Sequence, residues 1–528
     1  MEKSTGKKRA KKSSLRIALY SLIALALVLG GSLFFLRYYD QYKETLRQNI
    51  ISSGVFHKGI EVDGIAIGGM TFEEAKVALT VREAELVQNV GFTFSCDDTV
   101  YTADQSFFII NYTTDEVLSE AMALAREGDL KQLREETEDI STNGRYYRIT
   151  CTVEPDQPKF EAFFSTMATE RDIAPVDAFF AVKELPYDET TDGPAAFDIG
   201  LPEDGSITDL RDLRFDFTES VNGYGVDYEA LLKLVVNNTA SAKFGEILVP
   251  LSEVEAEVTV ETIKQQLVLR ASSKTSYGTT SLSKPGRLQN MKKASGKVYG
   301  TILHPGDEFS TNGTLGDRTL KGGWALAPAI IDGGADTEDQ PGGGVCQIST
   351  TLYGAVLSSD MRIVARRGHS SKSAYVDGGM DATIADSTTG NIDFKWANNT
   401  ESDVYVFVWL DTKTKEVFCE IYGEPLPETF DRIVLKSELT ETIQPTADVF
   451  IESSSLAAPY WQLKNAAKKG YRYKTYKVYM LGEEVVETVL VDETTYNMHP
   501  NRYNVWAGFR QLPQPLLSQY QLPLPKKN

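Results

Sequence analysis

The sequence predicts a multidomain α+β protein that one N-terminal transmembrane helix holds in a membrane. Three observations favour this fold class. An uncharged apolar segment follows a basic N-terminus, short apolar strands alternate with amphipathic helices, and a chain of 528 residues is too long for one core. We expect two small α+β modules, a larger α+β domain with a cysteine at a helix N-terminus, and a small all-β module at the C-terminal end.

The N-terminal segment has the pattern of a membrane anchor. Residues 1–16 are rich in lysine and arginine, and residues 17–36 carry no charge, a length that spans a hydrocarbon core of about 30 Å. The flank after residue 36 has mixed charge, so the positive-inside rule predicts a single-pass protein of the cell membrane with residues 1–16 in the cytoplasm and the bulk outside. The alternative is a cleaved signal peptide, but the apolar run is long and no A-x-A-like site follows. Residues 37–53 should continue as a helical stalk.

Composition and charge narrow the partners. The formal net charge is −20, and an acidic surface repels nucleic acid and anionic lipid, so we expect no nucleic-acid partner. The four cysteines are scattered without a C-x-x-C pair, which argues against a zinc site of the usual spacing and a disulfide scaffold. Cys96 and Cys151 could pair outside the cell, and the sequence leaves this open. No metal or cofactor is expected, and protein partners stay unknown.

Two consecutive stretches read as related small modules, residues 54–144 and 145–271. The first contains Thr71 and Glu74 in a capping-box pattern ahead of a helix, and a second helix is expected over 114–127. The second has a strand over 146–153 before a helix over 159–171, and Asp227 caps a further helix.

The rest of the chain divides at two further points. Residues 271–286 are rich in Ser, Thr, Gly and Pro, and read as a linker or as an extended strand leading into the domain at 272–425. After the boundary at 425–428, residues 429–508 alternate as strands, such as 473–480 and 485–491. The tail, 509–528, is rich in Pro and Gln and should be extended or disordered.

The segment QPGGGVCQISTTLY carries the candidate chemistry. Cys346 stands at the start of a helix expected over 347–357, where free N–H groups and the helix dipole favour a thiolate. Gly343 and Gly344 let the backbone approach a substrate closely, and together with Gln347 they could supply oxyanion or substrate contacts. The alternative is a cysteine that acts only as a small buried hydrophobe.

A strand over 362–365 leads to the second group of candidates. His369 could take a proton from the thiol and return it to a leaving amine, with Asp381 orienting the imidazole. Arg366 and Arg367 could receive a substrate carboxylate, or else form a solvated surface pair. Spacing alone does not show that Cys346 and His369 meet.

At these residues the chain resembles a known family. GGGVCQISTTLY, the arginine-rich strand with His369, and DATIA are similar to the core motif of the VanW domain, and the likeness extends upstream through Arg287 and Asn290 and downstream through Phe394. Residues 54–130 and, less closely, 170–265 resemble the YoaR-type domain associated with peptidoglycan binding. Residues 429–508 loosely resemble small all-β modules of bacterial surface proteins.

The resemblance implies a role at the Gram-positive cell wall, where the VanW family is tied to glycopeptide resistance. Some members are cysteine L,D-transpeptidases, although the chain lacks the S/T-H-G-C signature of the common L,D-transpeptidase fold. By this resemblance Cys346 would attack the third residue of a peptidoglycan stem and release D-alanine. The amine of a second stem would resolve the thioester, and water would give a carboxypeptidase instead. The alternatives are a non-catalytic peptidoglycan-binding or scaffolding protein and a partner of division or sporulation machinery.

Overall fold

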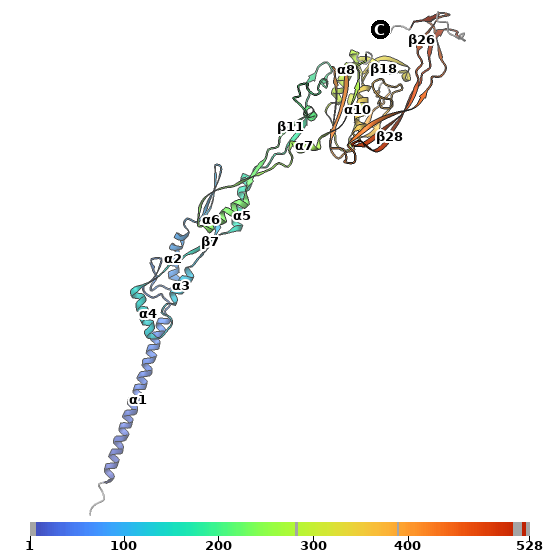
Figure 1. Ribbon diagram of the computed structural model, residues 1–528. Helices are drawn as coiled ribbons and strands as arrows, with labels where there is room; N and C mark the ends of the chain where they lie inside the picture. Colours follow the sequence, from blue (N-terminus) through green and yellow to red (C-terminus); the bar gives the residue numbers. More distant parts are fainter. Residues whose placement is uncertain (1–6, 280–283, 388–389, 510–519, 524–528) are drawn as a thin grey trace, which may run out of the picture. The chain divides into compact units, whose positions relative to one another are not determined.

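The computed structural model describes residues 7–279, 284–387, 390–509 and 520–523 (Figure 1). It confirms the predicted fold class, a multidomain α+β protein with a long apolar N-terminal helix and a strand-rich C-terminal region. The chain divides into two compact units, residues 1–174 with 222–254, and residues 175–221 with 255–528. Part of the expected basic stub, part of the expected linker and most of the expected tail lie outside the described residues.

The first helix joins the expected membrane span and stalk without a break, as α1 (Lys7–Ile51). Its portion Arg16–Ile51 is the one described helix long and apolar enough to cross a membrane, by length and composition. In the most apolar 18-residue stretch of this helix, 0% of the residues are buried against the rest of the protein. This length and composition fit a membrane anchor and also a signal sequence.

Unit 1, residues 1–174 with 222–254, contains two hydrophobic cores. Ile60, Leu118 and Ile140 belong to the first, and an aromatic group that includes Phe94 and Phe160 forms the second. Its elements are α1, β1 (Ile60–Val62), β2 (Ile65–Ala66), α2 (Phe72–Val87), β3 (Phe92–Cys96), β4 (Thr99–Ala103), β5 (Phe108–Tyr112), α3 (Thr114–Ala123), α4 (Leu130–Asn143), β6 (Arg145–Tyr147), β7 (Cys151–Pro155), α5 (Gln157–Arg171), β12 (Gly223–Val226), α6 (Tyr228–Ala240), β13 (Gly245–Leu248) and β14 (Leu251–Val254).

The expected capping box is present, because the Thr71 hydroxyl accepts from the Glu74 N–H at 3.3 Å and the Glu74 carboxylate accepts from the Thr71 N–H at 2.8 Å. The helix expected over 114–127 ends at Ala123, because Leu124 is already extended, with ψ of 139°, and the left-handed Ala125 follows it. The single strand expected over 146–153 is two strands in different sheets, since β6 pairs with β1 and β7 pairs with β5.

Strands from the two expected small modules pair with each other. β13 lies parallel to β3, and β7 runs antiparallel to β5. Residues 175–221 and 255–271, which we expected within the second module, lie in the other compact unit. The boundaries at 144 and 271 stay predictions. The chain passes from one compact unit to the other more than once, after residues 174, 221 and 254.

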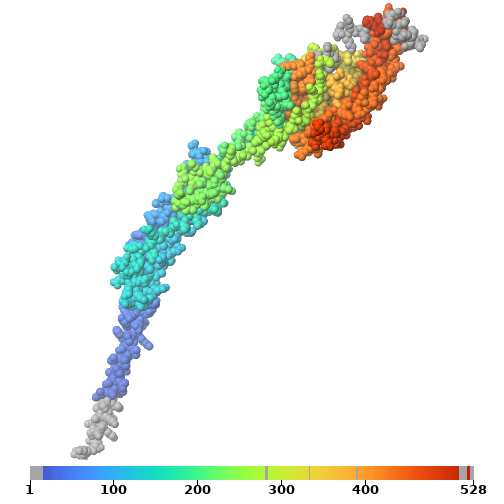
Figure 2. All heavy atoms as spheres, in the orientation of Figure 1, coloured from blue at the N-terminus to red at the C-terminus, as the bar shows by residue number. Residues whose placement is uncertain are grey.

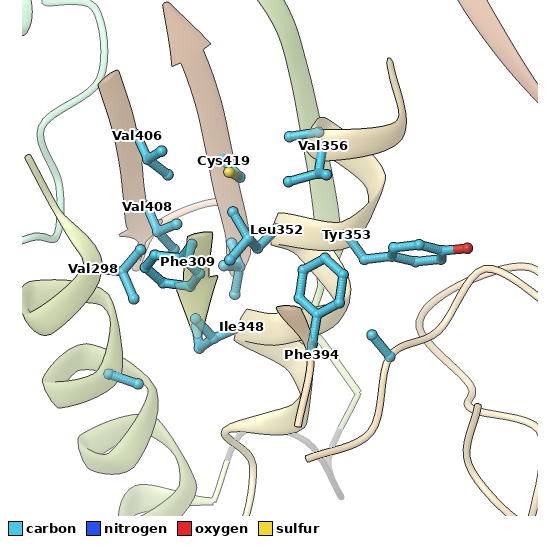
Figure 3. Packing of buried hydrophobic residues seen from close by; sticks show 14 of the residues in the cluster. Val298, Phe309, Ile348, Leu352, Tyr353, Val356, Phe394, Val406, Val408 and Cys419 are labelled. Carbon is cyan, nitrogen blue, oxygen red and sulfur yellow. The ribbon is translucent and has the colours of Figure 1, made fainter. Parts of the chain in front are cut away.

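Unit 2 is built around a four-stranded antiparallel sheet in the order β15-β23-β22-β16. Helix α10 lies on this sheet, and Figure 3 shows its Leu352 and Val356 facing Val406 and Cys419 of the strands. The elements of the central region are β15 (Val268–Ser276), α8 (Pro285–Val298), β16 (Thr301–Leu303), β17 (Glu308–Ser310), α9 (Thr311–Leu315), β18 (Leu326–Ile331), β19 (Asp336–Pro341), α10 (Cys346–Ser358), β20 (Arg362–Ala365), β21 (Lys395–Ala397), β22 (Val404–Asp411) and β23 (Glu416–Gly423).

The segment that we read as a linker or an extended strand is a strand over its first part. β15 begins at Val268, before the expected domain start, and pairs with β23 from Val268 to Ser276. Its Thr275 hydroxyl lies 2.7 Å from the Thr351 hydroxyl of α10 in the buried interior. The central domain therefore needs residues upstream of 272 to complete its sheet.

Residues 175–221 pack on the outer face of this sheet, where Figure 2 shows the green side chains of the segment against those of the central region. Arg214 makes a bidentate ion pair with Glu420 of β23, at 2.7 and 3.0 Å, and both side chains are buried. Removing either partner of a buried pair typically costs about 3–5 kcal/mol. The elements here are β8 (Phe179–Val182), β9 (Tyr187–Asp188), β10 (Gly193–Pro194), β11 (Phe215–Thr218) and α7 (Val260–Gln266).

The C-terminal region contains two small sheets, in the orders β24-β27-β28 and β25-β29-β26-β30. The strands expected over 473–480 and 485–491 are the inner parts of β27 and β28, which form a long hairpin. The elements are β24 (Arg432–Ile443), β25 (Val449–Ser453), β26 (Trp461–Asn465), β27 (Gly470–Leu481), β28 (Glu484–Tyr496), β29 (Arg502–Trp506) and β30 (Gln521–Leu522).

Candidate active site

Three glycines shape the turn that places Cys346 at the first residue of α10. Gly342 and Gly344 have φ of +80° and +106°, a region that residues with a side chain rarely adopt. A Cβ on Gly343 would lie 2.1 Å from the Ala327 carbonyl oxygen of β18. The turn is therefore held against β18 and the helix begins at the cysteine, as the sequence predicts.

Cys346 is partly buried, and its thiol has several polar neighbours. Its Sγ lies 3.4 Å from the Ile384 carbonyl oxygen, and the Ile384 N–H donates to it at 3.5 Å. The Thr383 hydroxyl is 3.8 Å away. His369 lies close enough to the thiol for each group to affect the ionisation of the other. The structure thus brings together the cysteine and the histidine, which the sequence alone could not establish.

Behind the histidine lies Asp381, which is fully buried. Its Oδ2 is 2.5 Å from Nδ1 of His369 and accepts the His369 backbone N–H at 2.7 Å. Because Nδ1 faces the carboxylate, Nε2 is the ring nitrogen left for the thiol. Cys346, His369 and Asp381 therefore stand in the order of a thiol, a base and an orienting acid.

The C-terminal region completes the support of Asp381. The Tyr496 hydroxyl of β28 donates to Asp381 Oδ1 at 2.5 Å and accepts from the Gly379 N–H at 2.7 Å. Thr475 of β27 also donates to the Gly379 carbonyl, at 3.1 Å. The loop that presents Asp381 is thus held by strands that the sequence assigned to a separate module.

These contacts set the ionisation of the site. At Cys346, burial opposes ionisation, but the hydrogen bond and charge of His369 outweigh it and lower the pKa of the thiol to about 7. At His369, burial disfavours the imidazolium, but Tyr375 and Asp381 raise its pKa well above the ordinary value. Burial also opposes the charge of Asp381, yet His369 holds the pKa of that carboxyl below its usual range. The site favours a thiolate–imidazolium pair near neutral pH.

This ion pair predicts a pH profile for alkylation of Cys346 by iodoacetamide. The rate should rise with pH around a midpoint near 7, because the thiolate is the nucleophile. A free cysteine has its midpoint at about 8.5. Peptide mapping separates this signal from Cys151, where burial raises the pKa of the thiol. A midpoint for Cys346 equal to that of Cys151 would contradict the ion pair.

Two other predicted residues, Gly343 and Gln347, have their polar groups engaged by the protein. Gly343 and Gln347 donate their N–H groups to the carbonyls of Gln340 and Gly344, so these two N–H groups do not form the expected oxyanion hole. The Gln347 side chain is fully buried and donates to Thr275 at 3.0 Å. It is a structural contact and not the expected substrate contact.

Arg366 differs from the expectation in the same way. Its guanidinium donates to main-chain carbonyls of Gly379 and Asp381 and to side chains of Asp492 and Thr494, and these contacts use every N–H group that it has. It joins the Asp381 loop to β28 and has no donor left for a substrate carboxylate. Arg367 is exposed, and its guanidinium has no hydrogen bond or ion pair among the described residues.

The sequence did not single out several residues that surround the thiol. Thr383 and Ile384 are its neighbours in space, and Tyr375 lies close enough to His369 to affect its charge. Arg287 and Arg318 flank the glycine turn, with their side chains against Gly344 and Gly342. The position of Arg287 in the resemblance was a signal for it, and Thr383 and Ile384 stand in the DATIA motif, whereas no pattern marked Tyr375.

The chain is thus a multidomain α+β protein in which Cys346, at a helix N-terminus, His369 and Asp381 form a candidate site. The family model described as VanW like protein matches residues 286–422 of this chain, so this part of the chain is similar to VanW domains. It is 32% identical to the YoaR protein of Bacillus subtilis over 24% of this chain and 39% of that protein. It is 27% identical to the vancomycin B-type resistance protein VanW of Enterococcus faecalis over 27% of this chain and 52% of that protein. The chain therefore spans about half or less of the length of these relatives.

Two solved structures of G5 domains also show a likeness. The G5 domain of an IgA1 protease matches with a TM-score of 0.12 and 17% identity, over 14% of this chain and 89% of its own. A second G5 domain matches with a TM-score of 0.09 and 19% identity, over 14% of this chain and 96% of its own. TM-scores of this size do not define a shared fold.

Proposed function

We propose that the protein is a membrane-anchored, cell-wall-associated cysteine acyltransferase that acts on peptidoglycan stem peptides. The family supports a role at the wall, since one relative is named as a vancomycin B-type resistance protein. The observation that carries the proposal is Cys346 at the N-terminus of α10, close to a buried His369 that Asp381 holds. This arrangement is the one that activates a sulfur nucleophile.

The reaction follows from the ionised pair. The Cys346 thiolate attacks the carbonyl of the third stem residue, and His369 gives its proton to the nitrogen of D-alanine as the C–N bond breaks. A thioester on Cys346 remains. The amine of a second stem then attacks the thioester and passes a proton to His369, and the thiolate departs. Both groups return to their starting charges, so no further reactant is needed.

The contrast with Cys419 favours this reading over a structural cysteine. Cys419 of β23 is fully buried, and burial alone raises the pKa of its thiol well above the ordinary value. Cys346 has a lowered pKa and a histidine partner. A domain that only binds or scaffolds peptidoglycan does not require an activated thiol. Binding without catalysis is therefore the second candidate function.

The proposed function also requires a particular orientation of the chain in the membrane. We place the residues before α1's apolar part in the cytoplasm and the rest of the chain outside, because the basic cluster at 1–16 opposes translocation. Peptidoglycan then lies on the side of the membrane where Cys346 is.

The test is direct detection of the acyl-enzyme. Full-length protein in detergent, mixed with a disaccharide-tetrapeptide, should gain the mass of the disaccharide-tripeptide acyl group on Cys346 and release D-alanine in equal amount. Proteolysis and tandem mass spectrometry place the adduct, and an amine acceptor should discharge it. Binding of the same substrate with neither adduct nor free D-alanine would favour the binding-only candidate.

A further inference from the structure

Arg287, near the start of α8, is a buried cation without an acidic partner in the described part of the chain. Its side chain is 8% exposed. One nitrogen, Nη2, donates to the Gln347 side chain at 3.0 Å, and Nε is buried with no hydrogen-bond acceptor among the described residues. Burying an unpaired charge is costly, and proteins normally place an anion beside it.

Other buried arginines of unit 2 are satisfied by the protein. Their partners are Glu420 for Arg214, Asp386 for Arg318, Asp381 and Asp492 for Arg366, and main-chain carbonyls of Ser359, Glu424 and Pro425 for Arg270. Arg287 therefore differs from this group in having a buried donor, Nε, without an acceptor among the described residues.

The Arg287 side chain lies against the glycine turn that precedes the candidate nucleophile. A Cβ on Gly344 would meet Arg287 Cγ at 2.6 Å and Nη1 at 3.2 Å, so the side chain runs along the turn that leads into Cys346. Its hydrogen-bond partner, Gln347, is the residue after the cysteine. Burial lowers the pKa of Arg287, while the nearby Tyr375 and Cys346 counteract this effect. The guanidinium is therefore within electrostatic range of both the thiol and Tyr375.

We propose that Arg287 binds the free C-terminal carboxylate of the acyl donor, on the leaving-group side of the bond that Cys346 attacks. A guanidinium suits a carboxylate because it donates two parallel hydrogen bonds. In a peptide that loses its last residue, this carboxylate is three bonds beyond the scissile carbonyl carbon, which matches a cation close to the thiol. The inference rests on the proposed function and specifies its substrate class, peptides that end one residue after the scissile amide.

The first test needs no turnover. Cys346 is alkylated with iodoacetate, an anion, and with iodoacetamide, its neutral counterpart, and the ratio of the two rates is measured by peptide mapping. Arg287→Gln should lower this ratio about 10-fold or more, because a charge-assisted contact to the carboxylate is lost. Arg287→Lys should keep part of it. The matched control is Arg362→Gln, which removes one positive charge from an exposed residue of β20.

The second test compares a tetrapeptide stem with its C-terminal carboxamide. The wild-type protein should have a kcat/KM about 100-fold higher for the free acid than for the carboxamide. Arg287→Gln should remove this preference by lowering kcat/KM for the free acid, with kcat/KM for the carboxamide unchanged. Equal use of acid and amide by the wild type would overturn the inference, and it requires no variant to fold. If neither peptide is turned over, the proposed function fails. The alkylation ratio then still decides whether Arg287 forms an anion site: an equal ratio in Arg287→Gln and the wild type overturns it.

Discussion

Cys346→Ser should abolish acyl transfer while leaving the fold and substrate binding intact. The hydroxyl occupies nearly the same space at the first turn of α10, but it ionises far less readily than a thiol whose pKa is about 7. His369 and Asp381 are arranged to stabilise a thiolate and cannot compensate for this difference. We expect a loss of at least about 10³-fold in the rate of dimer formation from disaccharide-tetrapeptides, because no nucleophile is available to form the intermediate. Cys346→Ala should lose the same activity.

The matched control is Cys151→Ser in unit 1, which also replaces a partly buried thiol. This variant should form cross-linked dimers from disaccharide-tetrapeptides at the wild-type rate. Circular dichroism and thermal unfolding check that the Cys346 variants remain folded. Wild-type cross-linking by a Cys346→Ser protein, purified free of other transferases, would rule out the enzyme and leave a binding role.

His369→Ala should lower turnover by about 10²–10⁴-fold, the usual contribution of a general acid and base. It should also change the pH dependence. With the imidazolium gone, the burial that raises the pKa of Cys346 is no longer outweighed. The midpoint of thiol alkylation should therefore move up from about 7, and the rate at neutral pH should fall.

The chain offers a matched control for this variant. His304 makes a similar pair with Asp403, with 2.8 Å between Nδ1 and the carboxylate, but it is exposed and has no thiol partner among the described residues. His304→Ala should leave both turnover and the alkylation midpoint unchanged. An unchanged midpoint in His369→Ala would mean that His369 does not ionise Cys346, and the proposed mechanism would be wrong.

Much of the local structure could be predicted from the sequence because its causes are local. The apolar run after a basic segment predicted the long helix α1, and the capping pattern at Thr71 predicted where α2 begins. The strand over 362–365 and the helix after the glycine turn lie where hydrophobic periodicity placed them. Each of these features depends on residues within one or two turns of each other.

Contacts between distant segments could not be predicted in this way. Arg214 and Glu420 are far apart in the chain, and nothing in either neighbourhood shows that they form a buried pair. The same holds for the pairing of β13 with β3 across the two expected small modules. The sequence does not distinguish polar residues of this kind from ordinary surface residues, because only folding removes the water around them.

For the site, the sequence by itself determined the turn, the helix start and the residue types: glycines that a tight turn requires, a cysteine at the first helical position, and a histidine and an aspartate after the next strand. Only the tertiary structure decided which of them meet. It joined His369 to Cys346 and Asp381, engaged Arg366 with the C-terminal strands, and left Arg287 buried without an anion. The physical reason is that ionisation and hydrogen bonding depend on burial and on neighbours in space, and the folded chain sets both.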